Sequence, residues 1–304
     1  METLARRGIP KARGKYEKRK KRAPFWYYAL LLLLIAVFGF CLWYLADYYL
    51  GSRQQAGEYD DLAALVEAAR GTAPTVPREE NPATDEAGNI IPDDGDFDLF
   101  QPPAKVEDIH DENGILLEYA PLYELNNDMA GWLRIEGTRI DYPVMHTPGR
   151  ADYYLKRNFN GEYSSWGCIY AREECDLETP SDNITLYGHH MKDGSMFAGL
   201  SAYTDREFWE EHRYIRFDTL TEHHTYAIFA VFTTTASEGQ GFAYHDFINA
   251  ADEPEFDTFI AKCLSLSLYG TDIMPEYGDK IICLSTCEYT QTNGRLVVAA
   301  VRID

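Results

Sequence analysis

The stretch Lys280-Ile281-Ile282-Cys283-Leu284-Ser285-Thr286-Cys287, followed after seven residues by Arg295-Leu296-Val297-Val298-Ala299-Ala300-Val301, decides the fold of this 304-residue chain. Both runs are rich in β-branched and apolar residues, as strands are. The connection Glu288–Gly294 is rich in turn formers and ends in Asn-Gly, which predicts an antiparallel hairpin. This hairpin places Cys287 opposite Arg295, and cross-strand neighbours have Cβ atoms only ~4.5–5.5 Å apart.

Short β-like runs separated by turn residues precede the hairpin, and helical patterns interrupt them. We expect helices over residues 115–125, Asp205–His212 and Pro254–Leu268. Eight strands without regular βαβ alternation predict a mostly β fold, a closed or nearly closed barrel decorated by helices. The eight predicted strands are Trp132–Ile135, Ile140–Met145, Gly167–Tyr170, Asn183–Tyr187, Tyr214–Phe217, Thr225–Thr233, Lys280–Thr286 and Leu296–Ile303.

A thiol beside a guanidinium at a barrel rim favours acyl transfer. A thiolate attacks a carbonyl, and the developing oxyanion needs fixed donors, which Arg supplies without losing its charge. An acid/base group is still required, and histidine is the usual one. Among the eight histidines we select His189, because it follows the strand Asn183–Tyr187 directly, after Gly188.

The other cysteines are not assigned a catalytic role. Cys263 and Cys283 are expected to be small buried hydrophobic residues. A disulfide between Cys168 and Cys175 is left open. The chain has no HExxH and no CxxC motif, so we expect no metal site and no cofactor.

Charge is unevenly distributed along the chain. Residues 1–24 carry a net charge of +8, whereas the whole chain carries −21. The negative total excludes a nucleic-acid binder, because it would repel the phosphates. Residues 25–46 contain no charged side chain and are long enough to cross the ~30 Å hydrocarbon layer. Aromatic residues flank this segment, as interfacial belts do. We therefore predict a single-pass protein of the plasma membrane, with a cytoplasmic amino terminus and the rest outside. A cleaved secretory signal is the alternative.

Four regions follow from this pattern. They are a basic cytoplasmic tail (1–24), a transmembrane signal-anchor helix (25–46), an extracellular acidic and proline-rich linker (47–111) and a catalytic domain (112–304). Within the linker, Leu62, Leu65, Val66 and Ala69 have helical spacing, so residues 54–70 are expected to form a short helix.

Three separated motifs in order make the chain resemble the sortases, and class B sortases most closely. These are Thr185-Leu186-Tyr187-Gly188-His189-His190-Met191, Leu284-Ser285-Thr286-Cys287-Glu288 and Gly294-Arg295-Leu296-Val297-Val298. Asn127–Ile135, Ile140–Met145, Asp152–Leu155 and Ser195–Phe197 also match that class. The similarity covers roughly residues 112–304. An Asp often found shortly after the Cys-Glu pair is replaced by Tyr289, so we assign no carboxylate to a triad.

Sortases are membrane-anchored cysteine transpeptidases of Gram-positive bacteria, built on an eight-stranded barrel. The resemblance implies that Cys287 attacks the carbonyl of a Thr in the C-terminal sorting signal of a surface protein. An amine of the peptidoglycan precursor, or of another protein, would resolve the thioacyl-enzyme. His189 would be the acid/base and Arg295 would hold the oxyanion. The residues implied to line the substrate groove are Ser285, Tyr187, Glu288 and Leu155.

Three alternatives remain at this stage. A cysteine endopeptidase would use the same three residues with water as acceptor, and a pilin-type ligase would use a protein amine. A non-catalytic membrane-tethered adaptor would not need Cys287. The recognised pentapeptide, the acceptor, the clients and the oligomeric state are left open, and loops around Phe242-Ala243-Tyr244 are expected to set specificity.

Overall fold

The computed structural model describes residues 25–72 and 102–304, apart from residues 238 and 289–292. The chain divides into two compact units, Met1–Gly51 and Ser52–Asp304. Helix α1 (Phe25–Thr72) is long and apolar enough in its first part to span a membrane, as predicted. The predicted basic tail, 1–24, and residues 73–101 of the predicted linker lie outside the described residues.

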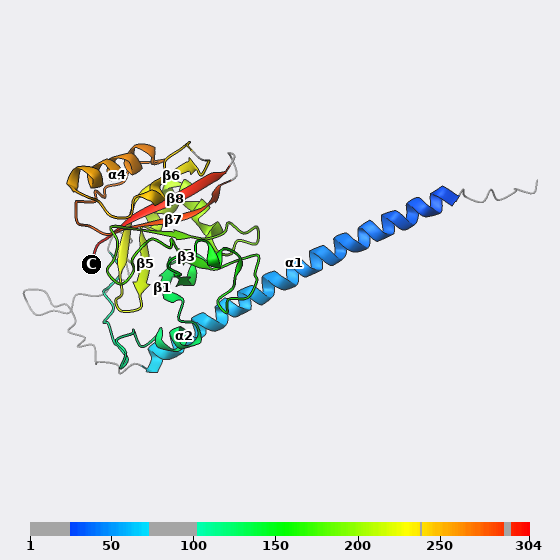
Figure 1. The fold of residues 1–304 in the computed structure, drawn as a ribbon, viewed down its shortest axis with the longest axis horizontal. Helices are drawn as coiled ribbons and strands as arrows, with labels where there is room; N and C mark the ends of the chain where they lie inside the picture. The colour runs from blue at the N-terminus through cyan, green and yellow to red at the C-terminus, as the bar shows by residue number, and fades with distance from the viewer. Residues whose placement is uncertain (1–24, 73–101, 238, 289–292) are drawn as a thin grey trace, which may run out of the picture. The chain divides into compact units, whose positions relative to one another are not determined.

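The second unit is built around a closed eight-stranded barrel, and all eight predicted strands are confirmed (Figure 1). The order around the barrel is β1-β2-β3-β4-β7-β8-β6-β5, with β5 returning to pair with β1. The strands are β1 (Met129–Arg134), β2 (Asp141–Met145), β3 (Ile169–Ala171), β4 (Asn183–Tyr187), β5 (Tyr214–Thr219), β6 (Thr225–Thr235), β7 (Ile281–Glu288) and β8 (Gly294–Arg302).

Two pairings bring distant parts of the sequence to one rim of the barrel. Strands β4 and β7 are parallel, so their carboxyl ends lie side by side, with Tyr187 opposite Ser285. Strands β7 and β8 form the predicted antiparallel hairpin. The segment after β4 therefore meets the end of β7 and the start of β8 at this rim.

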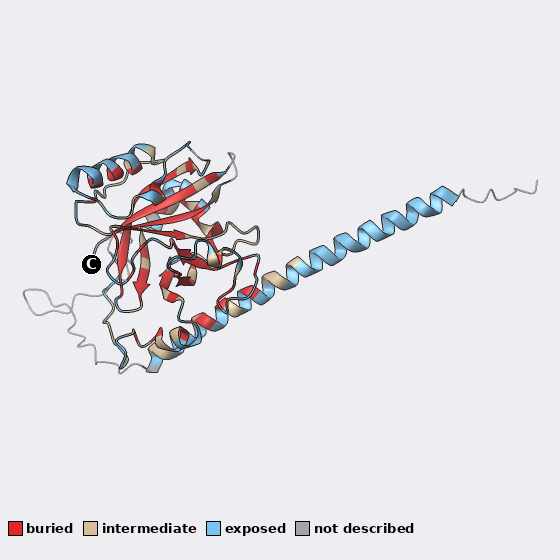
Figure 2. Ribbon diagram, in the orientation of Figure 1, coloured by how far each residue is buried: buried red, intermediate tan, exposed pale blue. Residues whose placement is uncertain are grey.

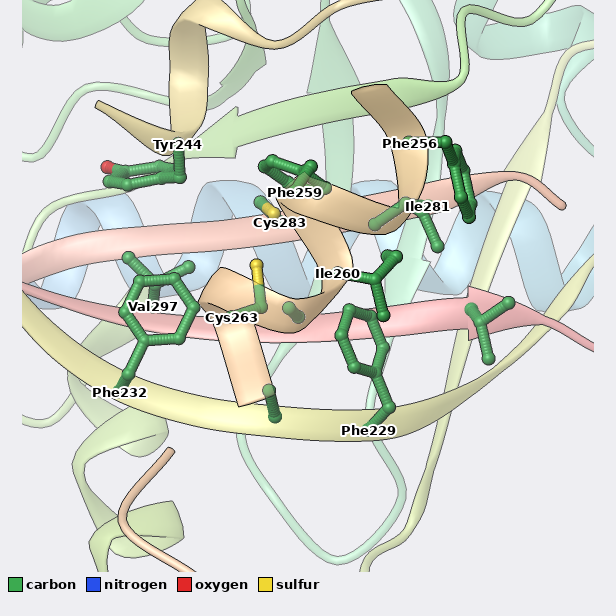
Figure 3. Close-up of a cluster of buried hydrophobic side chains, with 13 residues drawn as sticks. Phe229, Phe232, Tyr244, Phe256, Phe259, Ile260, Cys263, Ile281, Cys283 and Val297 are labelled. Carbon is green, nitrogen blue, oxygen red and sulfur yellow. The ribbon is translucent and has the colours of Figure 1, made fainter. Parts of the chain in front are cut away.

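Helix α4 (Glu253–Leu266) covers one face of the barrel. Asp252 caps its first turn by accepting from the backbone N–H of Glu255, and Pro254 occupies the first turn, where its missing N–H costs nothing. The buried side of α4 packs on β6, β7 and β8 in an apolar cluster (Figure 3). The cluster includes Phe229, Phe232, Phe256, Phe259, Ile260, Cys263, Ile281, Cys283 and Val297.

The other helices are short. Helix α3 (Arg206–Glu211) lies within the predicted range, and the 3-10 turns are η1 (Tyr153–Lys156), η2 (Phe197–Thr204) and η3 (Tyr244–Asp246). Helix α2 (Ala120–Leu125) is shorter than the predicted 115–125. The reason is Pro121, which fits the first turn of a helix, whereas in a helix that began at residue 115 it would leave the Leu117 carbonyl without its N–H donor.

The predicted linker, 47–111, is in its first part a folded segment of the barrel unit. Residues 54–70 are helical as predicted, but they are the last part of the 48-residue helix α1 and not a separate short helix. They belong to the compact unit that begins at Ser52, and they pack on the barrel. Tyr59, Leu62 and Val66 are buried, whereas the residues between them are mostly exposed (Figure 2). Near its end, Arg70 Nε lies 3.3 Å from the carboxylate of Glu118. We call residues 52–72 the docked segment of α1.

Candidate functional site

The hairpin β7–β8 holds the predicted nucleophile and the predicted cation together. Cys287 and Arg295 are direct partners in the register of the two strands, as the sequence predicts. The Nη1 group of Arg295 donates to the carbonyl of Gly294 at 3.0 Å, which fixes the half-buried guanidinium beside the strand start. Asn293, just before β8, adopts a left-handed conformation with φ of 54°, which Asn tolerates in turns.

Burial separates Cys287 from the other cysteines of the barrel unit. Its residue is only partly buried, whereas Cys168, Cys175, Cys263 and Cys283 are buried, and all of them are free thiols. Burial raises the pKa of the Cys283 and Cys263 thiols well above the usual range. Because the thiolate is the nucleophile, these buried thiols are poor candidates for chemistry at neutral pH. Cys263 and Cys283 are packing residues, as predicted.

Two histidines follow β4, and each binds a backbone carbonyl at the rim. His189 Nε2 lies 2.8 Å from the carbonyl oxygen of Leu155, and His190 Nδ1 lies 3.2 Å from that of Cys287. A carbonyl only accepts, so His189 carries its proton on Nε2 and leaves Nδ1 as the atom that accepts a proton. The structure thus brings both histidines to the rim that carries Cys287.

The end of β4 is tied to the end of β7 by hydrogen bonds on both sides of Gly188. The N–H of Gly188 donates to the backbone carbonyl of Ser285 at 3.2 Å, and the Thr286 hydroxyl donates to the Gly188 carbonyl at 2.9 Å. A Cβ atom at Gly188 would lie 2.6 Å from the side chains of Ile169 and Phe197. Glycine is required here because neighbouring side chains leave no space for a larger residue.

Tyr244 forms a hydrogen bond with the predicted groove residue Ser285. Its hydroxyl lies 2.5 Å from the Ser285 hydroxyl, and burial raises the pKa of Tyr244 to about 12. The residue comes from η3, in the insertion between β6 and β7. The sequence points to this loop but not to the side chain, because its partner is 41 residues away.

The remaining predicted groove residues have different surroundings. Burial raises the pKa of Tyr187, whose ring lies 5.4 Å from that of Tyr170. The positive charge of Arg172 opposes this increase, and Arg172 forms an ion pair with Glu174 at 2.8 Å. Leu155, in η1, is predicted to form an apolar wall of the substrate groove. In the structure its backbone carbonyl also contacts His189. Glu288 pairs with Gly294 through the backbone, and its side chain lies outside the described part.

Carboxylates surround the second histidine pair, His223 and His224. His223 is buried and bridges Asp108 at 2.7 Å and Glu118 at 2.8 Å. His224 lies 3.4 Å from the carboxylate of Asp304. Within residues 25–72 and 102–304, leaving aside 238 and 289–292, no group of three His, Cys, Asp or Glu residues is arranged to hold a metal ion.

Comparison with known proteins places this site in a family context. The sortase domain model matches residues 133–303. Sortase B of Listeria monocytogenes is 34% identical over 183 residues, covering 60% of this chain and 72% of that protein. Sortase B of Staphylococcus aureus is 31% identical over 185 residues, covering 60% and 73%. The crystal structure of sortase B from B. anthracis in complex with AAEK1 is similar with a TM-score of 0.56 at 34% identity, covering 66% of this chain and 89% of that one.

Proposed function

The chain belongs to the sortase family, in its class B, whose members are cysteine transpeptidases, and we propose that Cys287, His189 and Arg295 are its catalytic residues. The observation that carries this proposal is the direct pairing of Cys287 with Arg295 across β7 and β8. It joins a partly exposed thiol to a permanent cation at the rim where His189 and His190 lie. Acyl transfer needs these three functions together.

In the first half-reaction, the Cys287 thiolate attacks the carbonyl carbon of a Thr in a C-terminal sorting signal. The oxyanion that develops is held by the guanidinium of Arg295, which remains charged throughout. The carbon–nitrogen bond then breaks, and protonated His189 gives its Nδ1 proton to the leaving amine. The product is a thioester between Cys287 and the amino-terminal part of the surface protein.

In the second half-reaction, an amine of the peptidoglycan precursor attacks the thioester carbonyl. Neutral His189 takes a proton from this amine, and the Cys287 thiolate leaves as the new amide forms. The Leu155 carbonyl keeps the other imidazole nitrogen protonated throughout, so one nitrogen both gives and accepts the proton. We propose that Ser285, Tyr187, Glu288 and Leu155 line the groove that binds the sorting signal.

We further propose that residues 25–46 anchor the enzyme in the plasma membrane, with residues 1–24 in the cytoplasm. The positive-inside rule supports this orientation, because the cationic residues precede the apolar segment. The barrel would then face outward, where surface proteins with sorting signals and the peptidoglycan precursor are found.

A transpeptidation assay on the full-length enzyme in detergent tests the proposal. The substrate is the best member of a quenched fluorogenic peptide library with threonine at its central position, and triglycine is the acceptor amine. We expect cleavage after threonine and a triglycine-linked product, with Cys287→Ala inactive. Cleavage without any acceptor-linked product would instead identify a hydrolase, and activity retained in Cys287→Ala would remove Cys287 from the mechanism.

A further inference from the structure

Three consecutive contacts join the docked segment of α1 to the imidazole of His189. The first is a hydrogen bond from the Tyr59 hydroxyl to the Gly167 carbonyl. The second is close packing of Gly167 on the Leu155 carbonyl. The third is the hydrogen bond from His189 to that same carbonyl.

The first contact is buried and directional. Tyr59 is 5% exposed, and its hydroxyl donates to the Gly167 carbonyl at 2.9 Å. Its ring packs edge-on against Tyr142 of β2, with 5.1 Å between the centroids. A buried ring held by a β-strand gives its hydroxyl little freedom, so the hydroxyl fixes the position of the Gly167 peptide.

Two neighbours of Tyr59 in α1, Gln55 and Glu58, also accept hydrogen bonds from the loop between η1 and β3. The Ser164 hydroxyl donates to the Gln55 side chain at 2.7 Å, and the Asn158 amide donates to the Glu58 carboxylate at 3.2 Å. The docked segment therefore binds this loop through three side chains, Gln55, Glu58 and Tyr59, which lie within five residues of α1. A role in shaping the loop follows from this repeated contact.

The second contact is steric. Gly167 has a positive φ of 62°, and a Cβ atom there would lie 2.5 Å from the Leu155 carbonyl oxygen. The backbone of Gly167 thus packs directly on this oxygen. The neighbouring N–H of Cys168 donates to the Tyr154 carbonyl at 3.1 Å, which ties the two backbone segments together. A shift of Gly167 must be transmitted to the Leu155 peptide.

The third contact orients the imidazole of His189. A base in an acyl-transfer site is commonly oriented by a third group that accepts from its second nitrogen. Here the Leu155 carbonyl accepts from His189 Nε2 at 2.8 Å. The orientation and tautomer of His189 consequently depend on where the Leu155 peptide lies.

We propose that Tyr59 is a positioning residue for His189, acting through Gly167 and the Leu155 carbonyl. The docked segment of α1 is then a working part of the catalytic domain, because it fixes the loop that orients the acid/base group. This inference rests on the proposed catalytic role of His189. A purely structural Tyr59 would change the stability of the fold without changing the titration of the acid/base group.

The test compares Tyr59→Phe with a matched control, Tyr203→Phe, in the full-length enzyme in detergent. Tyr203 is also buried, and its hydroxyl likewise donates to a backbone carbonyl, that of His212, at 2.9 Å. We measure kcat, KM and the pH profile of kcat with the threonine peptide and triglycine, together with the thermal midpoint of each variant. Assays are run well below the thermal midpoint of the less stable variant.

We expect Tyr59→Phe to lower kcat about tenfold, within the range that a misplaced catalytic group causes, and to leave KM nearly unchanged. The limb of its pH profile that His189 determines should move, because the His189 hydrogen bond is altered. Tyr203→Phe should lower the thermal midpoint while keeping kcat and its pH profile. The inference is overturned if Tyr59→Phe keeps the wild-type profile and kcat, or if both variants lose activity only in proportion to stability. An active His189→Ala enzyme would instead refute the proposed catalytic role itself.

Discussion

The imidazole of His190 donates through Nδ1 to the carbonyl of Cys287 at 3.2 Å, whereas that of His189 donates through Nε2 to Leu155. One ring is thus bound to the backbone of Cys287, the proposed nucleophile, and the other to the backbone of Leu155 in η1. The first arrangement fixes the end of β7. The second leaves Nδ1 of His189 for proton transfer, so the two histidines have separable roles.

Substitution of each histidine tests this separation. His189→Ala should lose about 10²–10⁴-fold in kcat, the usual contribution of an acid/base group. His190→Asn should stay within a few-fold of wild type, because the Asn amide also donates to the Cys287 carbonyl. Peptide cleavage by both variants is the measurement, with thermal midpoints to verify folding. The reverse ranking would assign the acid/base role to His190.

Arg295→Lys should lower kcat about 10²–10³-fold, the range observed when one oxyanion donor is removed. Lysine keeps the charge but replaces a planar fork by a point charge, so it does not reproduce the geometry. Arg302→Lys, at the opposite end of the same strand, is the control for changes in β8. Steady-state kinetics and thermal midpoints distinguish the two. Wild-type turnover by Arg295→Lys would exclude Arg295 from the mechanism.

The hairpin and barrel follow from local sequence patterns. The alternation in β7 and β8 and the short connection that ends in Asn-Gly predict that Cys287 faces Arg295, and the strand register confirms this pairing. The eight strands were likewise found from short apolar runs bounded by turn residues. Parallel pairing of β4 with β7 then follows only from the closed barrel, and it brings His189 to the same rim.

The contacts that orient the site were not predictable from such patterns. The apolar spacing of residues 54–70 predicts a helix, but Tyr59 meets Gly167 at a separation of 108 residues. Leu155 was selected for its apolar side chain, whereas its carbonyl makes the contact with His189. Backbone acceptors exist at every residue, so no residue type marks the one that is used.

Alkylation should distinguish Cys287 from the other barrel cysteines. Iodoacetamide at neutral pH is expected to modify Cys287 in the native enzyme and Cys283 and Cys263 only after denaturation. Burial both shields these two thiols and raises their pKa. Peptide mass spectrometry locates the adduct. Cys283→Ala and Cys263→Ala should alter stability and keep turnover, and an inactive but well-folded Cys283→Ala enzyme would show that the assigned nucleophile is wrong.

Gly188→Ala should impair both folding and catalysis. The added Cβ would lie 2.6 Å from Phe197 and Ile169, so the backbone that carries His189 must move. We expect a lower thermal midpoint and a kcat reduced more than KM is raised. Gly199→Ala is a suitable control, because a Cβ there meets only ordinary contacts, the nearest at 3.7 Å. Equal behaviour of the two variants would argue against the close approach at Gly188.

The buried pair His223–Glu118 should make stability depend on pH in both directions. Burial lowers the pKa of His223, but the carboxylates of Glu118, Asp218 and Asp108 outweigh it and raise the pKa above its usual 6.5. Burial raises the pKa of Glu118, but the hydrogen bond from His223, a backbone hydrogen bond and the charges of His223 and Arg70 together outweigh it, and the pKa falls from 4.5 to about 2. Each group is therefore more readily charged in the folded protein than in the unfolded chain.

The signs follow from linkage between protonation and folding. The His223 contribution is complete below pH 6.5 and is lost as the pH rises through its raised folded value. The Glu118 contribution is complete above pH 4.5 and is lost as the pH falls toward 2. Stability should thus be highest between these limits and decline on either side.

Urea unfolding of the full-length enzyme across this range measures the effect. His223→Gln should lower stability most at mildly acidic pH and flatten the decline on the alkaline side, because the group that titrates there is gone. His212→Gln is the control, since the His212 ring binds the Phe208 carbonyl at 3.0 Å and stacks on the Phe208 ring. An alkaline decline that persists unchanged in His223→Gln would show that another group is responsible for it.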